Sequence, residues 1–179
     1  DNFSVIYDCY QGNEAFMTAS QKEKIDEMAS SPHYRKMLHE LRQPVQELKD
    51  FLRERKMGVQ KIQFFTNRPE VRLKLMEELP RRFADLSVSS SVVDNVEITQ
   101  QHANKGEALL ALAVHLGLKR EQIMAFGDGL NDLTMLKAAG IGVAMANAQE
   151  EVKKSADFIT DSNDEDGIVK VIDTFILPN

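Results

Sequence analysis

The sequence predicts an α/β protein with a doubly wound, Rossmann-like parallel sheet after about residue 100 and a smaller α+β domain with an antiparallel sheet before it. Up to residue 100, β-like runs come in adjacent pairs with helices between them. Beyond it, short apolar strands alternate with helices, which is typical of a parallel sheet. A polar, glycine-containing segment follows one of these strands, at the place where such sheets bind ligands.

Residues 1–100 are expected to form the smaller domain. Gln11-Gly12-Asn13 is a hairpin signal between two β-like runs, and Val71, Leu75 and Leu79 repeat at helical spacing. The expected elements are strands over 3–10 and 15–18, a helix over 45–57, a strand over 61–66, a helix over 71–79 and strands over 86–90 and 92–99.

Residues 101–179 are expected to alternate between helix and strand. Gly117 and Gly140 each follow an apolar helical stripe, and the last helix carries apolar residues at i, i+3, i+4 and i+7. The expected order is a helix over 109–116, a strand over 122–126, a helix over 133–139, strands over 141–146 and 157–159, and a helix over 168–175.

Composition indicates a globular protein, since 42% of the 179 residues are hydrophobic and 28% are charged. The net charge of −6 argues against nucleic-acid and acidic-membrane partners, which bind positive surfaces. After residue 100, 12 acidic residues stand against 7 basic ones. Cys9 is the single cysteine, so no disulfide forms within the chain, and a cytoplasmic location is expected.

The segment Phe126-Gly-Asp-Gly-Leu-Asn-Asp-Leu-Thr-Met-Leu136 is the most informative part of the sequence. Asp128 stands at the carboxyl end of an expected strand, and Asn131 and Asp132 open the next helix. Carboxylates placed close together repel one another, and a hard cation such as Mg²⁺ relieves that repulsion. The plainer interpretation, which the segment alone favours, is that Asp132 caps the helix and Asp128 is a solvated turn residue.

Lys105 favours a functional site when it is considered together with that segment. It opens the preceding helix, 23 residues before Asp128. A lysine at a helix start is locally unfavourable, because the helix dipole already concentrates positive charge there. It suits a site that binds an anion such as phosphate, although a lone lysine is more often a surface residue.

Together these segments resemble the haloacid dehalogenase (HAD) superfamily, and within it the Cof-like type IIB phosphatases. The matching stretches are NKGEALLALAVHLGL, IMAFGDGLNDLTMLKAAGIGVAMANAQEEVKKSADFIT and NDEDGIVKVI, which cover nearly all of residues 104–173. The stretch from KIQFFTNRPE to VEIT is similar to the family's α/β cap, with fewer diagnostic residues. The resemblance implies that residues 1–100 are a substrate-specificity cap and residues 101–179 the C-terminal half of the hydrolase core.

The resemblance also implies a Mg²⁺-dependent phosphatase for small phosphorylated metabolites such as sugar phosphates. In that family an aspartate attacks phosphorus, and water then hydrolyses the aspartyl-phosphate. Lys105 would offset the charge of the nucleophile and the phosphoryl group, and Asp128 would bind Mg²⁺. Asp132 would act from outside the coordination sphere, orienting metal-bound water or Lys105. Asn131 would bind the phosphate or the leaving group, and Asn147 would help to shape the phosphate pocket.

The family's first motif, an apolar strand that runs into Asp-x-Asp-Gly-Thr, is absent from this sequence. Residues 164–167 (Asp-Glu-Asp-Gly) resemble it, but they follow polar residues, and Ile168 stands where threonine belongs. Residues 64–67 (Phe-Phe-Thr-Asn) resemble the second motif, but they lie in the cap stretch. The nucleophile is therefore expected outside these residues, through truncation rather than loss of catalysis, and the chain alone is expected to be inactive.

Two other function classes stay open at this point. GDGLND also resembles the phosphorylation domain of P-type ATPases, although the longest apolar run, residues 109–118, is far shorter than a membrane span. A non-catalytic binding or regulatory protein on the HAD scaffold is the second alternative. It would be favoured if the sequence upstream also lacked the Asp-x-Asp pair.

Overall fold

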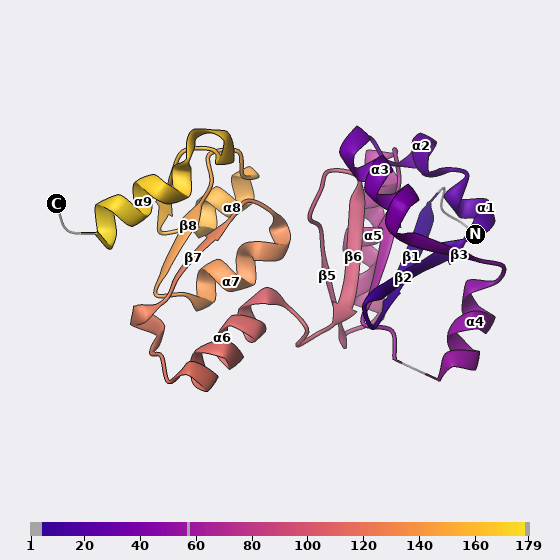
Figure 1. Ribbon diagram of the computed structural model, residues 1–179, viewed down its shortest axis with the longest axis horizontal. Helices are drawn as coiled ribbons and strands as arrows, with labels where there is room; N and C mark the ends of the chain where they lie inside the picture. Colours follow the sequence, from indigo (N-terminus) through magenta and orange to yellow (C-terminus); the bar gives the residue numbers. More distant parts are fainter. Residues whose placement is uncertain (1–4, 57, 178–179) are drawn as a thin grey trace. The chain divides into compact units, whose positions relative to one another are not determined.

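The computed structural model describes residues 5–56 and 58–177, and the chain forms two compact units, residues 1–101 and 102–179 (Figure 1). Each unit has its own sheet and its own hydrophobic clusters. In the described part of the chain, no helix combines the length and the apolar character needed to cross a membrane.

The first unit contains a six-stranded sheet in the order β3-β2-β1-β4-β6-β5. All neighbouring strands are antiparallel except β2 and β3, which are parallel. Residues 19–41 separate these two strands and supply the long connection that a parallel pair needs. The strands are β1 (Ile6–Gln11), β2 (Glu14–Thr18), β3 (Arg42–Val45), β4 (Lys61–Phe65), β5 (Leu86–Ser89) and β6 (Asn95–Gln100).

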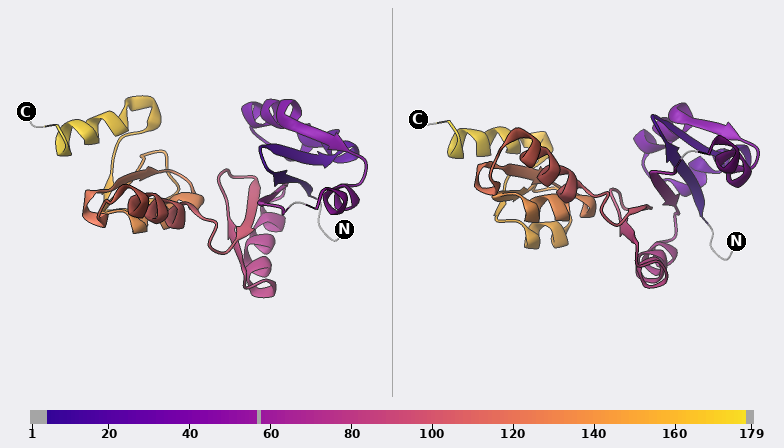
Figure 2. Two further views of the ribbon diagram at one scale, coloured as in Figure 1. Left: turned by 60° about the horizontal axis from the view of Figure 1, so that its bottom comes forward. Right: turned by 90° about the horizontal axis from the view of Figure 1, so that it is seen from below.

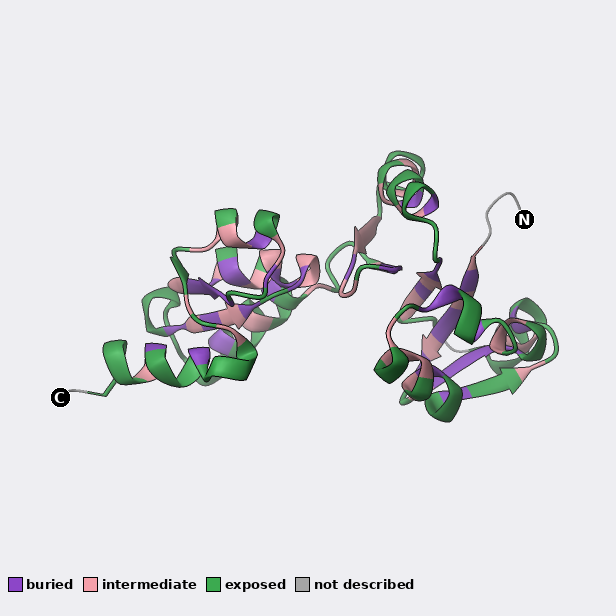
Figure 3. Ribbon diagram, turned by 90° about the horizontal axis from the view of Figure 1, so that it is seen from above, coloured by how far each residue is buried: buried purple, intermediate pink, exposed green. Residues whose placement is uncertain are grey.

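Helices pack on both faces of this sheet. Side chains alternate between the faces along each strand, so Ile6 and Phe65 pack with α2 and α3, whereas Cys9 packs with α4 and Val96 with α5. Figure 3 shows buried residues concentrated on the strands and exposed residues on the outer sides of the helices. The helices are α1 (Ala19–Lys22), α2 (Ile25–Met28), α3 (Pro32–Leu41), α4 (Leu48–Arg55) and α5 (Pro69–Arg82).

Most boundaries differ from the expected ones by a few residues. The strand expected over 3–10, for example, is β1 (Ile6–Gln11), and residues 3 and 4 lie outside the described residues. Two of the differences have a clear local cause. The helix expected over 45–57 is α4, because Val45 ends strand β3 and Lys56 takes a left-handed conformation with φ 52° after Arg55. Met57 lies outside the described residues. The helix expected over 71–79 is longer, because Pro69 begins α5 at a position where its missing N–H costs no hydrogen bond.

A row of buried polar side chains crosses the first sheet. Asp8, Gln63 and Glu97 occupy paired positions on β1, β4 and β6. Arg42 Nε of β3 donates to Asp8 Oδ2 at 2.6 Å, and Gln63 Nε2 donates to Glu97 Oε1 at 2.7 Å. Burial raises the pKa of the Asp8 carboxyl by more than the Arg42 guanidinium lowers it. The first unit therefore carries charged groups in its interior.

The second unit contains a three-stranded parallel sheet in the order β7-β8-β9, which confirms the predicted α/β class. Figure 1 and the left view of Figure 2 show α7 and α9 on opposite sides of β7 and β8. The elements are α6 (Lys105–Leu116), β7 (Met124–Gly127), α7 (Leu133–Ala138), β8 (Ile141–Ala144), α8 (Glu150–Ser155), β9 (Phe158–Ile159) and α9 (Gly167–Phe175), with short 3₁₀ turns η1 (Arg120–Gln122), η2 (Leu130–Asp132) and η3 (Asn163–Glu165).

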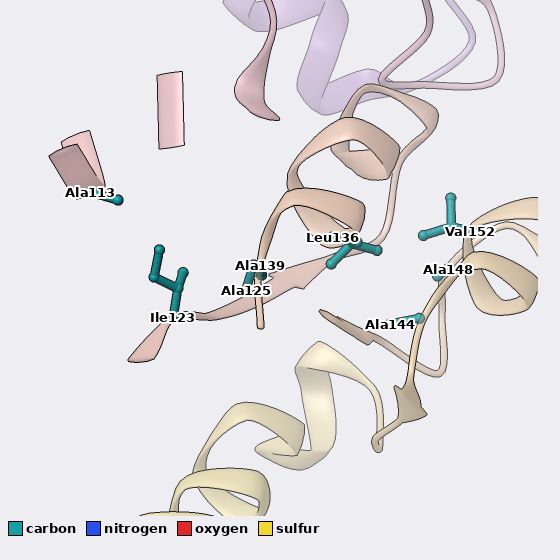
Figure 4. Packing of buried hydrophobic residues seen from close by; sticks show 8 residues of the cluster. All are labelled: Ala113, Ile123, Ala125, Leu136, Ala139, Ala144, Ala148 and Val152. Carbon is teal, nitrogen blue, oxygen red and sulfur yellow. The ribbon is translucent and has the colours of Figure 1, made fainter. Parts of the chain in front are cut away.

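Small side chains dominate the core between the strands and helices α6, α7 and α8. The cluster in Figure 4 consists of Ala113, Ile123, Ala125, Leu136, Ala139, Ala144, Ala148 and Val152. Gly142 belongs to the same close packing, since a Cβ there would lie 2.6 Å from the backbone oxygen of Leu136. Helix α7 can therefore approach the sheet closely, which places the start of α7 directly beside the end of β7.

Candidate active site

Asp132 is the most firmly held side chain of the expected site. It lies at the end of η2 and is only 4% exposed. Its Oδ2 accepts from the backbone N–H groups of Asp128 at 2.9 Å and Gly129 at 3.0 Å, and its Oδ1 accepts from Lys105 Nζ. Gly127 makes room for this arrangement, because a Cβ there would lie 2.5 Å from Asp132 Cβ. One buried carboxylate thus shapes the loop after β7 and orients a lysine from another helix.

Lys105 is the first residue of α6, and its neighbours fix where that helix begins. Asn104 caps the helix, with Oδ1 accepting from the backbone N–H of Glu107 at 3.0 Å. The backbone N–H of Gly106 donates to Thr134 Oγ1 of α7 at 3.1 Å, and a Cβ on Gly106 would lie 2.5 Å from the Thr134 backbone oxygen. The side chain of Lys105 is 49% exposed, so its ammonium group remains accessible to an anion.

Asp128 stands at the carboxyl end of β7 and is exposed. Its Oδ2 accepts from Asn147 Nδ2 at 3.1 Å. Asn147 follows β8, whose last residue, Ala144, pairs with Gly127 at the end of β7. The pairing of parallel strands therefore brings the two residues to the same edge of the sheet, where one carboxylate faces outward.

The two asparagines of the expected site differ in their surroundings. Asn131 lies in η2 and is partly buried, and no hydrogen bond of its side chain is found within the described part of the chain. Its amide is therefore open to a ligand. Asn147, which was expected to help shape a phosphate pocket, directs its amide to Asp128 and to the backbone N–H of Asn163. Residue Asn163 was not expected near the site, since 16 residues separate the two asparagines.

The carboxylates of this site can supply part of a magnesium site. Within the described residues, no group of three or more His, Cys, Asp or Glu side chains is arranged to hold a metal ion. Both oxygens of Asp132 already accept hydrogen bonds from the protein, which leaves Asp128 for direct coordination. Mg²⁺ commonly binds one or two carboxylates and completes its shell with water and substrate oxygens. Asp128 fits one position of such a shell.

Comparison with known families agrees with this geometry. A family model described as haloacid dehalogenase-like hydrolase matches residues 2–172, almost the entire chain. The chain belongs to this family. The membership predicted from the segments around Lys105 and Asp128 is therefore confirmed. The match also includes the first unit, where the sequence carried fewer diagnostic residues.

Three similar proteins have names of phosphatases or hydrolases. The chain is 44% identical over 108 residues to the 5-amino-6-(5-phospho-D-ribitylamino)uracil phosphatase YcsE of Bacillus subtilis, an alignment that covers 60% of this chain and 43% of the relative. A haloacid dehalogenase-like hydrolase from B. subtilis has a TM-score of 0.81 at 27% identity, over 96% of this chain and 66% of that one. The subclass IIB sugar phosphatase BT4131 shares the fold, with a TM-score of 0.74 at 24% identity over 97% and 62% of the two chains. The chain spans less than two thirds of each of these proteins.

Proposed function

We propose that these residues belong to a Mg²⁺-dependent phosphomonoester hydrolase. The observation that carries the proposal is the arrangement of Lys105, Asp128 and Asp132 at the carboxyl edge of the second sheet. A half-exposed ammonium group lies against a buried carboxylate, and an exposed carboxylate stands four residues before that one. This combination suits a phosphate monoester as substrate. The ammonium group can offset the charge of the phosphate, and the exposed carboxylate can hold a metal ion that offsets it further.

Each residue has a role that follows from its contacts. Asp132 holds the ammonium group of Lys105 in place, so that it is preorganised beside the transferring phosphoryl group. Asp128 would hold Mg²⁺, which supplies charge compensation for an anionic substrate approaching an anionic nucleophile. Asn131 offers an amide to the phosphate or the leaving group. The attacking carboxylate, which would form the aspartyl-phosphate, is assigned to polypeptide beyond these 179 residues, because the sequence lacks Asp-x-Asp-Gly-Thr.

The first unit is proposed as the cap that selects the substrate, and the second as the C-terminal half of the catalytic core. A compact fold with its own sheet supports a separate role for the first unit. Small phosphorylated metabolites such as sugar phosphates are the proposed substrates, in keeping with the phosphoribityl compound in the name of the B. subtilis relative. A cytoplasmic location is proposed with them, because Cys9 is buried and free.

The test uses a longer protein that joins these residues to a strand ending in Asp-x-Asp-Gly-Thr. We expect it to hydrolyse p-nitrophenyl phosphate with Mg²⁺ and to stop when EDTA removes the metal. Asp128→Ala should abolish turnover, because the charge repulsion between substrate and nucleophile is then uncompensated. Asp173→Ala, which removes an exposed carboxylate from α9, is the matched control. Metal-independent turnover, or full turnover by the 179-residue chain alone, would contradict the proposal.

A further inference from the structure

Asn147 uses both halves of its side-chain amide within the second unit. Its Nδ2 donates to Asp128 Oδ2 at 3.1 Å, and its Oδ1 accepts from the backbone N–H of Asn163 at 3.2 Å. The two partners determine the orientation of the amide, because an ionised carboxylate only accepts and a backbone N–H only donates. Asn147 therefore connects the exposed carboxylate after β7 to the segment that precedes α9.

That segment, residues 160–167, is held in place by its own hydrogen bonds. Thr160 Oγ1 donates to the backbone oxygen of Gly167 at 2.7 Å, and Ser162 Oγ donates to Glu165 Oε2 at 2.8 Å. A Cβ on Gly167 would lie 2.2 Å from the backbone oxygen of Asp161, so this approach requires glycine. The Asp161 oxygen also accepts from the N–H of Ala146 at 3.3 Å, directly before Asn147. Asn163 thus presents its N–H from a fixed backbone.

We propose that Asn147 is a positioning residue that holds the Asp128 carboxylate in one rotamer, with residues 160–167 as its support. An exposed aspartate otherwise samples several rotamers, and a metal ligand that must first be ordered binds less tightly. A neutral amide suits this role, because it orients the carboxylate without bringing a positive charge that would compete with a divalent cation. The purpose of the positioning rests on the function proposed above, whereas the positioning itself can be measured without any activity.

The direct test is NMR of the 179-residue chain, using the three-bond coupling between the backbone nitrogen and Cγ of Asp128. The native chain should give the value of a single rotamer. Asn147→Leu, which keeps the branched shape and removes both polar groups, should give an averaged value. Asn163→Pro should also give an averaged value, because it removes the N–H that donates to Asn147. The backbone should tolerate this proline, since Ser162 is already extended, as the residue before a proline prefers. Asn163→Ala keeps that N–H and should match the native chain.

In the longer protein, Asn147→Leu should raise the Mg²⁺ concentration for half-maximal turnover by roughly 10–100-fold, the usual effect of losing a group that supports a metal ligand. A single Asp128 rotamer that persists in Asn147→Leu, while the amide spectrum elsewhere stays native, overturns the proposal. Persistence in Asn163→Pro overturns the part assigned to residues 160–167. A third outcome separates the two proposals. If the Asp128 coupling is averaged in Asn147→Leu but the longer protein shows no Mg²⁺-dependent turnover, the positioning is supported and the proposed phosphatase is contradicted.

Discussion

Asp132 and Asp128 lie in one loop, but their surroundings suit the two aspartates to different roles. The Asp132 carboxylate is buried and accepts from two backbone N–H groups and from Lys105. Asp128 is exposed and accepts from one amide. A carboxylate that already has three donors gains little from a metal ion, whereas an exposed one keeps coordination sites for it. The different surroundings thus favour metal coordination by Asp128 and orientation of Lys105 by Asp132.

Lys105→Ala gives the first prediction for the longer protein. We expect kcat/KM to fall on the order of 10²-fold, about 3 kcal/mol of transition-state stabilisation, because a preorganised cation is lost. Stability should change little, since an ion pair with one half-exposed partner contributes about 1 kcal/mol or less, and Asp132 keeps its two backbone donors. Steady-state kinetics and thermal unfolding check the two parts. Lys137→Ala, an exposed lysine of α7, is the control, and an equal loss of rate there would contradict the role of Lys105.

The position of Lys105 depends on how α6 meets α7. Gly106 is buried at the second position of α6, where its N–H donates to Thr134 and its missing Cβ lets the two helices approach. Glycine is normally unfavourable inside a helix by about 1 kcal/mol relative to alanine. Its presence beside Lys105 is therefore a sequence signal for close packing. Helix propensity alone would not identify it.

Gly106→Ala should destabilise the second unit, although alanine is the better helix former. The new Cβ would lie 2.5 Å from a backbone oxygen, which cannot move aside as a flexible side chain could. Overpacking of this kind costs about 1–3 kcal/mol. Calorimetry or circular dichroism during heating measures the loss, and turnover of the longer protein reports the displacement of Lys105.

The control for this substitution is Gly58→Ala, where an added Cβ meets nothing within 4 Å. That variant should have native stability or gain slightly, since alanine restricts the unfolded chain. If Gly106→Ala is as stable as Gly58→Ala, then α6 and α7 can separate freely, and the contact does not fix Lys105.

Local sequence patterns predicted the helices and strands of the chain better than they predicted which of them pair or pack together. The alternation of helix and strand predicted the second unit, because each short strand ends at a glycine or a polar turn. No element was expected over residues 19–44, where α1 and α2 have four residues each and β3 contains Pro44. The ten-residue helix α3 was missed there, although Ser31 caps it and Pro32 begins it. The parallel edge pair of the first sheet was therefore not predicted. Proline is tolerated at such an edge because the N–H that it lacks can face solvent.

In the candidate site, too, contacts between segments far apart in the sequence were harder to predict than local features. The spacing of Lys105, Asp128 and Asp132 along helix starts and strand ends indicated one sheet edge, where the structure brings them together. The contact between Asn147 and Asn163 depends on how the chain turns after β9, which no local pattern specifies. The buried pair of Asp8 and Arg42 was missed for a similar reason, because its partners are 34 residues apart and lie on different strands.

That buried pair distinguishes the interior of the first unit from the alanine-rich core of the second. Asp8 and Arg42 have side chains that are 0% and 2% exposed, and one Asp8 oxygen, Oδ1, has no hydrogen-bond partner in the described residues. Removing one partner of a buried ion pair costs about 3–5 kcal/mol, because the other charge is left uncompensated. Replacing both by apolar side chains is often neutral. The first unit should therefore lose stability when one partner is removed and keep most of it when both are replaced.

Arg42→Met should lower the free energy of unfolding of the first unit by about 3–5 kcal/mol at pH 8, and by less at pH 4.5. Burial already raises the pKa of Asp8 above its ordinary value of 3.8, and the loss of Arg42 removes the main influence that lowers it. A carboxyl with a raised pKa in the folded state contributes fully to stability below the unfolded pKa, and that contribution is lost as pH rises through the folded pKa.

Urea unfolding followed by tyrosine fluorescence measures this unit selectively, because all three tyrosines lie in residues 1–101 and the chain has no tryptophan. The double variant Asp8→Leu with Arg42→Met should regain most of the stability and lose the added pH dependence. An equal loss at both pH values in Arg42→Met would show that Asp8 does not titrate in this range.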